Sequence, residues 1–151
     1  MEAILAKDSM NGLSKNGEIP WKSKTDMKFF YNTTKNSTVV MGRNTYFSLP
    51  ARPLKNRLNI VLTTKHFEPE ENVAFTNDFD PSLFHKVFII GGKQVYDQYI
   101  PLCDVVWVTQ IKSNYFCDLI FDVKLLDLFE MKEVVHEDSE LVIMKYIKRS
   151  V

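Results

Sequence analysis

Residues 86–96 read Lys-Val-Phe-Ile-Ile-Gly-Gly-Lys-Gln-Val-Tyr, an apolar run that meets two glycines and then continues at helical spacing. The run from Val87 to Ile90 does not alternate with polar residues, which is typical of a strand that helices cover on both faces of a parallel sheet. Beyond the glycines, helical spacing continues to residue 100, where Pro101 ends it. The stretch therefore predicts a buried central strand that turns directly into a helix.

The paired glycines, Gly91 and Gly92, have two explanations that the local pattern leaves open. Because glycine has no Cβ, a ligand can approach the backbone closely, and a helix that starts there directs free N–H groups toward a phosphate. A tight turn between a strand and a helix uses the same residue type. We expect either a turn or a cofactor site.

Length and charge restrict the class of protein. The chain of 151 residues can bury one core and is too short for two ordinary domains, so we expect a single domain, residues 1–151. Nineteen basic residues balance nineteen acidic ones without a block of either sign, which argues against nucleic acid or a membrane as a partner. No run has the length of a membrane span, and no signal peptide is recognisable. Cys103 and Cys117 form neither a CxxC pair nor a disulfide framework, which favours a reducing cytoplasmic or nuclear compartment; we expect a cytoplasmic location.

Apolar runs and turn residues predict the remaining elements. Further strands are expected at residues 3–6, 38–41, 58–64, 73–76, 105–111, 131–135 and 141–147. Further helices are expected at residues 26–31, after Ser23 or Thr25 as N-cap, at 43–49, and weakly near 81–85. Residues 10–18 form a mobile loop on composition, and residues 112–127 are irregular. We expect an α/β fold with a central eight-stranded, mostly parallel sheet, an antiparallel C-terminal strand in a hairpin, and about four flanking helices.

Common catalytic motifs are missing from the sequence. There is no GxSxG, GxxxxGK[ST] or GxGxxG, and the three histidines share no ligand spacing with the cysteines, so no metal site is expected. One carboxylate remains of interest, Asp26, which borders the apolar helix face of Met27 and Phe30 shortly after Trp21. An Asp there can simply stabilise the helix dipole. However, all five glycines lie in the mobile loop or at strand ends, where open α/β sheets bind ligands.

Several stretches, taken together and in order, resemble the dihydrofolate reductase family. They are Gly17-Glu18-Ile19-Pro20-Trp21 with Asp26 and Phe30, Val40-Met41-Gly42-Arg43-Asn44-Thr45, Arg52-Pro53-Leu54-Lys55-Asn56-Arg57, Ile89-Ile90-Gly91-Gly92 with Val95-Tyr96, and Val108-Thr109. The resemblance spans almost the whole chain. It implies reduction of 7,8-dihydrofolate to 5,6,7,8-tetrahydrofolate by hydride transfer from NADPH, in support of one-carbon metabolism and thymidylate synthesis. We expect a monomer.

The resemblance also implies roles on the substrate side. Asp26 is expected to accept two hydrogen bonds from the pterin and, with a raised pKa, to assist its protonation through water. Thr109 resembles the hydroxyl that backs this carboxylate, Trp21 the indole that holds the local water, and Arg57 the arginine that binds the substrate's α-carboxylate. Core packing alone would also explain Trp21. The implied walls of the substrate site, each of which could be ordinary core, are Ile4, Leu5, Met27, Phe30, Leu49, Leu54 and Ile90.

On the cofactor side, the resemblance implies that the peptide between Gly91 and Gly92 is cis and meets NADPH. The 2′-phosphate is expected beside Arg43, Thr63, Thr64 and Lys65, although a solvated position explains Lys65 almost as well. Thr45 is expected at the pyrophosphate, and Ala6 and Ile19 beside the nicotinamide and the lid. The other implied cofactor contacts are Ser14, Gly42, Asn44, Lys93, Gln94, Val95 and Tyr96.

Two positions depart from the family, and two other functions remain open. Ser14 and Cys117 stand where the family usually has glycine, whereas Asp118 is retained and is expected to accept N–H groups of the lid around Ser14 and Lys15. A pteridine or pyrimidinone reductase of the same fold is one alternative, against which Asp26 and Arg57 argue together. A catalytically silent binding module is the other, and it would have lost the carboxylate or the cofactor arginine.

Overall fold

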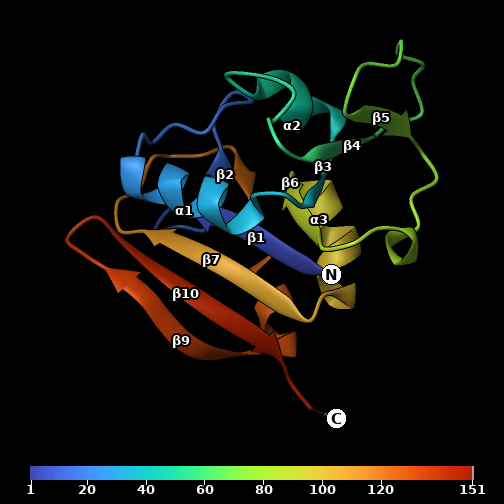
Figure 1. Ribbon diagram of the computed structural model, residues 1–151. Coiled ribbons are helices and arrows are strands. Elements are labelled where there is room, and N and C mark those ends of the chain that lie inside the picture. Colours follow the sequence, from blue (N-terminus) through green and yellow to red (C-terminus); the bar gives the residue numbers. More distant parts are fainter. Residues whose placement is uncertain (151) are drawn as a thin grey trace.

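An eight-stranded sheet forms the centre of the computed structural model, which describes residues 1–150 (Figure 1). In spatial order its strands are β5 (Val73–Thr76), β4 (Leu58–Leu62), β3 (Thr38–Gly42), β6 (Val87–Gly91), β1 (Glu2–Lys7), β7 (Val105–Ile111), β10 (Leu141–Lys148) and β9 (Phe129–Glu137). Neighbours from β5 to β7 pair in parallel, and β10 pairs antiparallel with both β7 and β9. The predicted sheet, its strand count and its C-terminal hairpin are confirmed.

All four predicted helices are present, and two short helices were missed. The α-helices are α1 (Lys24–Thr34), α2 (Arg43–Ser48) and α3 (Lys93–Tyr99), and the 3₁₀ helices are η1 (Pro81–Leu83), η2 (Ile100–Leu102) and η3 (Val123–Leu128). Ser23 is the N-cap of α1, and its hydroxyl accepts the N–H of Asp26 at 3.1 Å. The missed helices, η2 and η3, are 3₁₀ turns too short or irregular to produce a 3.6-residue pattern. Of the described helices, none is long and apolar enough to cross a membrane.

The prediction of two structureless segments needs correction. Gly12–Ser14 forms β2 and pairs antiparallel with β8 (Leu119–Ile120), so the loop of residues 10–18 and the irregular segment of residues 112–127 are joined by a small second sheet. Strands of two and three residues are too short for alternation to be visible in the sequence. The remaining tip, residues 15–18, is a tight turn in which Asn16 and Gly17 have φ of 51° and 80°.

The sheet separates two hydrophobic layers, because neighbouring residues of a strand point to opposite faces. In β1, Leu5 packs with Val95 and Tyr96 of α3, whereas Ile4 packs on the other face, on the side of α1 and α2. Both faces of β6 are covered, and its residues are all buried. This two-sided burial explains the apolar run without alternation.

A buried polar side chain shapes the loop before β4. Asn59 is fully buried; its Oδ1 accepts the N–H of Leu54 at 3.0 Å, and its Nδ2 donates to the carbonyls of Leu54 and Arg57 at 3.0 and 3.1 Å. The side chain thereby replaces the backbone partners that this loop lacks. Asn59 thereby fixes the backbone at Leu54 and Arg57, two of the residues that the sequence predicts to bind substrate.

We predict that Asn59→Ala lowers the free energy of unfolding by about 2–4 kcal/mol, because buried groups of the loop lose their partners. The same variant should raise KM for a substrate bound at Arg57 more than it lowers kcat. Urea denaturation and steady-state kinetics measure the two effects. Asn77→Ala, at an exposed position, is the matched control; equal effects of the two substitutions would contradict the role of Asn59.

Candidate functional site

The carboxyl ends of β3 and β6 bring the starts of α2 and α3 together. A Cβ built on Gly42 would lie 3.4 Å from Val95 Cγ2, and one built on Gly92 would lie 3.2 Å from Thr45 Oγ1. Gly42 and Gly92 are the N-caps of α2 and α3, and within residues 1–150 neither helix has a capping side chain. The first N–H groups of both helices therefore remain available to an electron-rich ligand group at this edge.

The peptide between Gly91 and Gly92 is cis, as the resemblance implies. Gly91 has φ of 127°, a conformation that L side chains rarely adopt, and the ring of Tyr96 lies 3.4–3.5 Å from where its Cβ would be. The Tyr96 hydroxyl donates to the carbonyl of Ile4 at 2.8 Å. Tyr96 is thus a core residue that holds the glycine turn against β1.

Asp26 lies in the first turn of α1 and is only partly exposed. Burial raises the pKa of its carboxyl above the usual value, and the nearby Thr109 hydroxyl partly opposes the rise. Thr109 is buried in β7 and pairs with Ala6 of β1. The structure therefore brings Asp26, Thr109 and Ala6 together, and it gives the carboxyl an environment that favours its protonated form.

Trp21 is buried between α1 and the end of β7, in a cluster with Ile111 and Phe29. Its ring meets that of Tyr115 edge to face at a centroid distance of 5.7 Å. In the described part of the chain, Trp21 Nε1 is the buried side-chain polar atom that has no hydrogen-bond acceptor. Since buried indole N–H groups ordinarily find one, this N–H can donate to a ligand or to a water beside it.

An apolar wall extends from Asp26 along the α1 side of the sheet. Five of the predicted wall residues share one cluster: Ile4, Phe30, Leu49, Leu54 and Ile90. Met27 lies outside that cluster and is 49% exposed on the surface of α1. The side chain of Leu5 points into the opposite layer, so only its backbone can border this wall. The sequence could not distinguish the two layers, because both neighbours in β1 are equally apolar.

Arg57 closes the outer end of the wall with a guanidinium that is fixed in place. It is 9% exposed; Nε donates to Thr34 Oγ1 at 3.0 Å, Nη2 donates to the carbonyl of Tyr31 at 2.6 Å, and Nη1 donates to that of Lys55. A guanidinium has five N–H groups, so one remains on each terminal nitrogen. Two such groups can bind both oxygens of a carboxylate.

The predicted phosphate-binding residues follow two neighbouring strands. Gly42 and Leu62 are partners at the ends of β3 and β4, so Arg43 and Thr63 start adjacent segments. Thr63 Oγ1 accepts the N–H of Lys65 at 3.0 Å, and Thr64 and Lys65 are exposed. The structure brings these four residues to one corner of the sheet edge.

The other predicted cofactor residues differ in their exposure and in their contacts. Lys93 Nζ lies 3.3 Å from Asp97 Oδ2 in an ion pair on the surface of α3. Asn44 and Gln94 are exposed, whereas Val95 is buried beneath the start of α2. Lys93 and Val95 thus have structural contacts that explain them without a ligand.

The loop of residues 10–18 lies against the segment that contains Asp118. The N–H of Asn16 donates to Asp118 Oδ2 at 2.9 Å, and the N–H of Asp118 donates to the carbonyl of Ser14 at 3.1 Å. Asp118 thus accepts an N–H of this loop, as expected, but the donor is Asn16 and not Ser14 or Lys15. Ile19 is 62% exposed beyond the turn. We call residues 10–19 the lid.

Asp8 is a buried carboxylate that the sequence analysis did not identify. Its Oδ1 accepts the N–H groups of Met10 and Gly12 at 2.9 and 2.7 Å, while Oδ2 accepts that of Tyr115 at 2.9 Å and faces the Cys117 thiol at 3.6 Å. Burial alone would raise its pKa, but these hydrogen bonds outweigh burial and lower the pKa. Asp8 therefore ties the lid to the segment before β8 as a charged acceptor.

A local signal for Asp8 was present in the sequence. An Asp directly after a strand and before Asn and Gly often accepts backbone N–H groups two to four residues further on. The bond to Tyr115 has no such signal, because the two residues are 107 positions apart.

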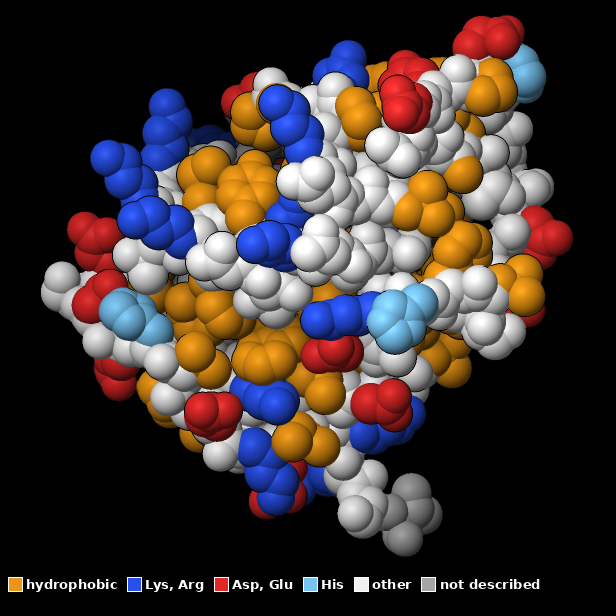
Figure 2. Space-filling view, in the orientation of Figure 1, with side chains coloured by type: hydrophobic (Ala, Val, Ile, Leu, Met, Phe, Trp, Pro, Cys, Tyr) orange, Lys and Arg blue, Asp and Glu red, His pale blue; other side chains and the backbone are white. Residues whose placement is uncertain are grey.

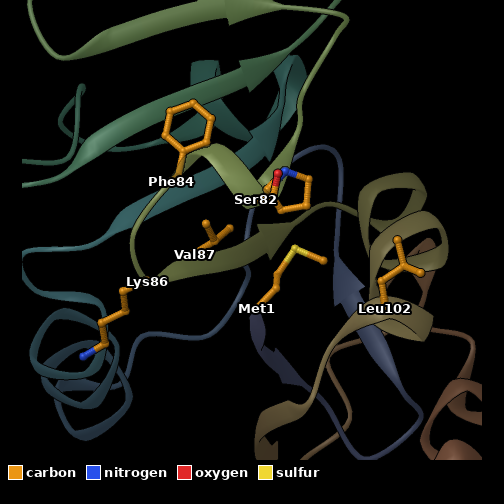
Figure 3. A pocket seen from close by; sticks show the side chains of 7 residues that line it. Met1, Ser82, Phe84, Lys86, Val87 and Leu102 are labelled. Atoms are coloured by element: carbon orange, nitrogen blue, oxygen red, sulfur yellow. The ribbon is translucent and has the colours of Figure 1, made fainter.

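A separate hollow of about 300 Å³ lies at the amino ends of β1 and β6 (Figure 3). Its lining is largely apolar, with the polar Ser82 and Lys86 besides Met1, Pro81, Phe84, Val87 and Leu102. It contains none of the predicted site residues. Parallel sheets bind ligands at the opposite, carboxyl edge, which is where the predicted residues gather. Among residues 1–150, no group of three or more possible metal ligands is present.

Uncapped helix starts beside glycine backbone, next to an apolar wall with one carboxyl of raised pKa, fit an α/β enzyme that binds an anionic group beside an apolar ring. Comparisons with known proteins specify the family. The family model described as dihydrofolate reductase matches residues 1–147. Dihydrofolate reductase of Ureaplasma parvum is 42% identical over 128 residues, which cover 82% of each chain. This chain belongs to the dihydrofolate reductase family.

Two further proteins are similar to this chain, one of known structure and one bifunctional. The structure of dihydrofolate reductase from Enterococcus faecalis complexed with NADP(H) and RAB-propyl matches with a TM-score of 0.85 at 29% identity, and the match covers 99% of this chain and 96% of that one. A bifunctional dihydrofolate reductase-thymidylate synthase of Zea mays is 34% identical over 142 residues, which cover 78% of this chain and 27% of that protein.

We predict that Asp8→Asn slows hydride transfer and lowers the free energy of unfolding by about 1–3 kcal/mol at neutral pH, because an amide cannot accept on both sides. Since the folded pKa of Asp8 lies below the unfolded pKa, its contribution is complete above the unfolded value and disappears as the pH falls through the folded one. The stability difference from wild type should therefore vanish in strong acid.

Single-turnover kinetics with deuterated NADPH and denaturation at several pH values measure these effects. Asp118→Ala is the comparison, because it removes an exposed contact to the same lid; it should slow the hydride step and barely change stability. An Asp8→Asn variant with wild-type hydride transfer would show that Asp8 only supports the fold.

Proposed function

We propose that Asp26 is the residue that orients the pterin and promotes its protonation in this enzyme. As a member of its family, the protein is an NADPH-dependent dihydrofolate reductase, which converts 7,8-dihydrofolate to tetrahydrofolate. The observation that supports the role of Asp26 is a carboxyl whose pKa burial raises, within an apolar wall and backed by Thr109. A carboxyl in such an environment can bind a polar ring edge and keeps its proton to a higher pH than an exposed aspartate does.

The chemistry at Asp26 follows from its two oxygens. As a carboxylate, it can accept hydrogen bonds from two adjacent N–H donors of the pterin edge and fix the ring against Phe30 and Ile4. When protonated, it can pass a proton through water toward the ring nitrogen beside the carbon that accepts hydride. Trp21 Nε1, a buried donor, can hold that water. NADPH, when bound, supplies the hydride.

Arg57 fits the other end of the same substrate. Its two remaining N–H groups match the α-carboxylate of the glutamate, and Leu49 and Leu54 line the path of the aminobenzoyl ring. A pteridine without a glutamate tail would leave this fixed guanidinium without a partner, which argues against a pteridine or pyrimidinone reductase.

The residues at the sheet edge fit NADPH. The nicotinamide would lie near Ala6, Ile19 and the glycine turn, and the pyrophosphate near Thr45, where side chains on Gly42 and Gly92 would fill the space. Arg43, Thr64 and Lys65 would surround the 2′-phosphate. The lid, including Ser14, would close over this region and exclude water during hydride transfer.

We also propose that residues 1–151 act as one domain, as a monomer and in the cytoplasm. The continuous eight-stranded sheet supports a single unit, and the two free cysteines agree with a reducing compartment. Sedimentation over a range of protein concentrations tests the monomer. Tetrahydrofolate that is produced in that compartment would support one-carbon metabolism and thymidylate synthesis.

We predict that Asp26→Asn reduces kcat/KM for dihydrofolate at neutral pH by about 10²- to 10⁴-fold, while NADPH binding stays unchanged. The amide presents a donor where the carboxylate presents an acceptor, and it cannot relay a proton. Activity should recover partly in acid, where solvent protonates the substrate. A wild-type rate at pH 7 would remove Asp26 from this role.

Asp26→Asn should not destabilise the fold at neutral pH, although it reduces activity. Because the folded pKa of Asp26 is raised, its ionisation destabilises the fold as the pH rises through the window between the unfolded and folded values. Asp26→Asn removes this charge, so its melting temperature at neutral pH should equal or exceed that of wild type. A lower melting temperature would mean that the loss of activity reflects misfolding.

We predict that Arg43→Ala weakens NADPH binding by about 1.5–3 kcal/mol, roughly 10- to 150-fold, because a charged hydrogen bond to the 2′-phosphate is lost. NADH binding, which lacks this phosphate, should change little. Fluorescence titration with both cofactors measures the difference, and Arg149→Ala, near the C-terminus, is the control. An equal loss of affinity for NADPH and NADH would show that Arg43 does not bind the 2′-phosphate.

A further inference from the structure

We propose that Lys35 and Lys55 form an anion-binding mouth at the outer end of the substrate groove, which favours dihydrofolate with additional γ-linked glutamates over the form with one. This inference rests on the proposed position of the substrate tail at Arg57. It concerns the carboxylates beyond the one that Arg57 binds.

The groove at Arg57 is lined by cations. It has a volume of about 400 Å³, and its lining residues are Tyr31, Asn32, Lys35, Ala51, Pro53, Leu54, Lys55, Asn56 and Arg57. Of these described lining residues, three are basic and none is acidic. In a protein with equal numbers of acidic and basic residues, this local excess favours a ligand with several negative charges.

Two similar turns place the lysines beside each other. Lys35 precedes Asn36 after α1, Lys55 precedes Asn56 before β4, and the two asparagines adopt φ of 57° and 59°. The N–H of Asn36 donates to the carbonyl of Asn56 at 3.1 Å, which joins the turns. Arg57 Nη1 donates to the carbonyl of Lys55, so the guanidinium is connected to the same turn. The mouth is therefore a fixed piece of backbone that carries two flexible ammonium groups.

The charges of these lysines are free to meet a ligand. Both side chains are exposed, and within residues 1–150 neither forms an ion pair, whereas Lys93, Lys112 and Lys132 each do. Figure 2 shows Lys and Arg side chains around α1 on this face, with hydrophobic side chains exposed between them.

Arg57 can bind one carboxylate of the substrate tail, so any further carboxylates of the tail need other partners. Only two of its N–H groups remain, enough for one carboxylate. Any further carboxylate of the tail must lie farther out, where Lys35 and Lys55 are. A longer anionic tail would thus gain contacts that a single glutamate cannot make, without any change at the pterin.

Steady-state kinetics with dihydrofolate that carries one or five γ-linked glutamates tests the proposal. At low ionic strength, wild type should have a KM about three- to tenfold lower for the pentaglutamate, since each exposed ion pair contributes little. Lys35→Gln/Lys55→Gln should abolish this preference, with kcat and the monoglutamate KM within about twofold of wild type. Salt near 0.5 M should weaken the preference in wild type, because it screens exposed charges.

The matched control is Lys124→Gln/Lys132→Gln, which changes the net charge equally on η3 and β9 and should keep the preference. A wild type without preference, or a preference that survives in Lys35→Gln/Lys55→Gln, would overturn the proposal. Arg57→Lys separates it from the proposed function: this variant should raise KM for both substrates. An unchanged KM for the monoglutamate in Arg57→Lys would instead refute the placement of the tail.

Discussion

The packing of Tyr96 over Gly91 is the contact on which the arrangement of the site depends. Gly91 ends the central strand with a positive φ, and the Tyr96 hydroxyl anchors the following helix to the carbonyl of Ile4 in the neighbouring strand. This contact fixes where α3 starts, and α3 in turn packs beside the start of α2. A side chain at Gly91 would be strained in this conformation and would press on the ring. One glycine therefore positions two helix starts and the β1 backbone together.

Three aspartates differ in their contacts, and two of them in pKa, because their environments differ. Burial without backbone donors raises the pKa of Asp26, whereas backbone N–H groups around the buried Asp8 lower its pKa. Asp118 is exposed and accepts one lid N–H. Ionisation of Asp26 opposes folding, while ionisation of Asp8 supports it. A carboxyl such as Asp26, proposed here to act on the substrate, can destabilise the fold when polar anchors such as Asp8 stabilise the surrounding loops.

The sequence could predict the main sheet because its signals are local. The apolar runs, the turn glycines and Ser23 as N-cap each act within a few residues, and they identified all eight strands of the sheet and four helices. Family resemblance then gave the candidate site residues, many of which lie at one sheet edge. The small sheet of β2 and β8, the Asn59 clamp and the full set of bonds at Asp8 could not be predicted. They depend on contacts between segments far apart in the chain, or on a buried side chain whose partner is backbone.

The two departures from the family have different consequences for the lid. A Cβ on Gly12 would lie 2.5 Å from Cys117 Cβ and 2.8 Å from Asp8 Oδ1, so the side chain at 117 occupies space that only a glycine at 12 leaves free. Burial raises the pKa of the Cys117 thiol to about 11, so it stays neutral beside Asp8 and acts as packing. The base of the lid is thus fixed by buried contacts.

The outer part of the lid has fewer fixing contacts than its base. Its turn at Asn16 and Gly17 is exposed, and a Cβ on Gly17 would meet no atom within 4 Å. The bond from Asn16 to Asp118 is exposed as well, so water can replace it at little cost in free energy when the lid opens. Ser14, at the border between the two parts, keeps its backbone paired with the segment of Asp118. A serine is acceptable at position 14 because the positive φ values occur two and three residues further on, at Asn16 and Gly17.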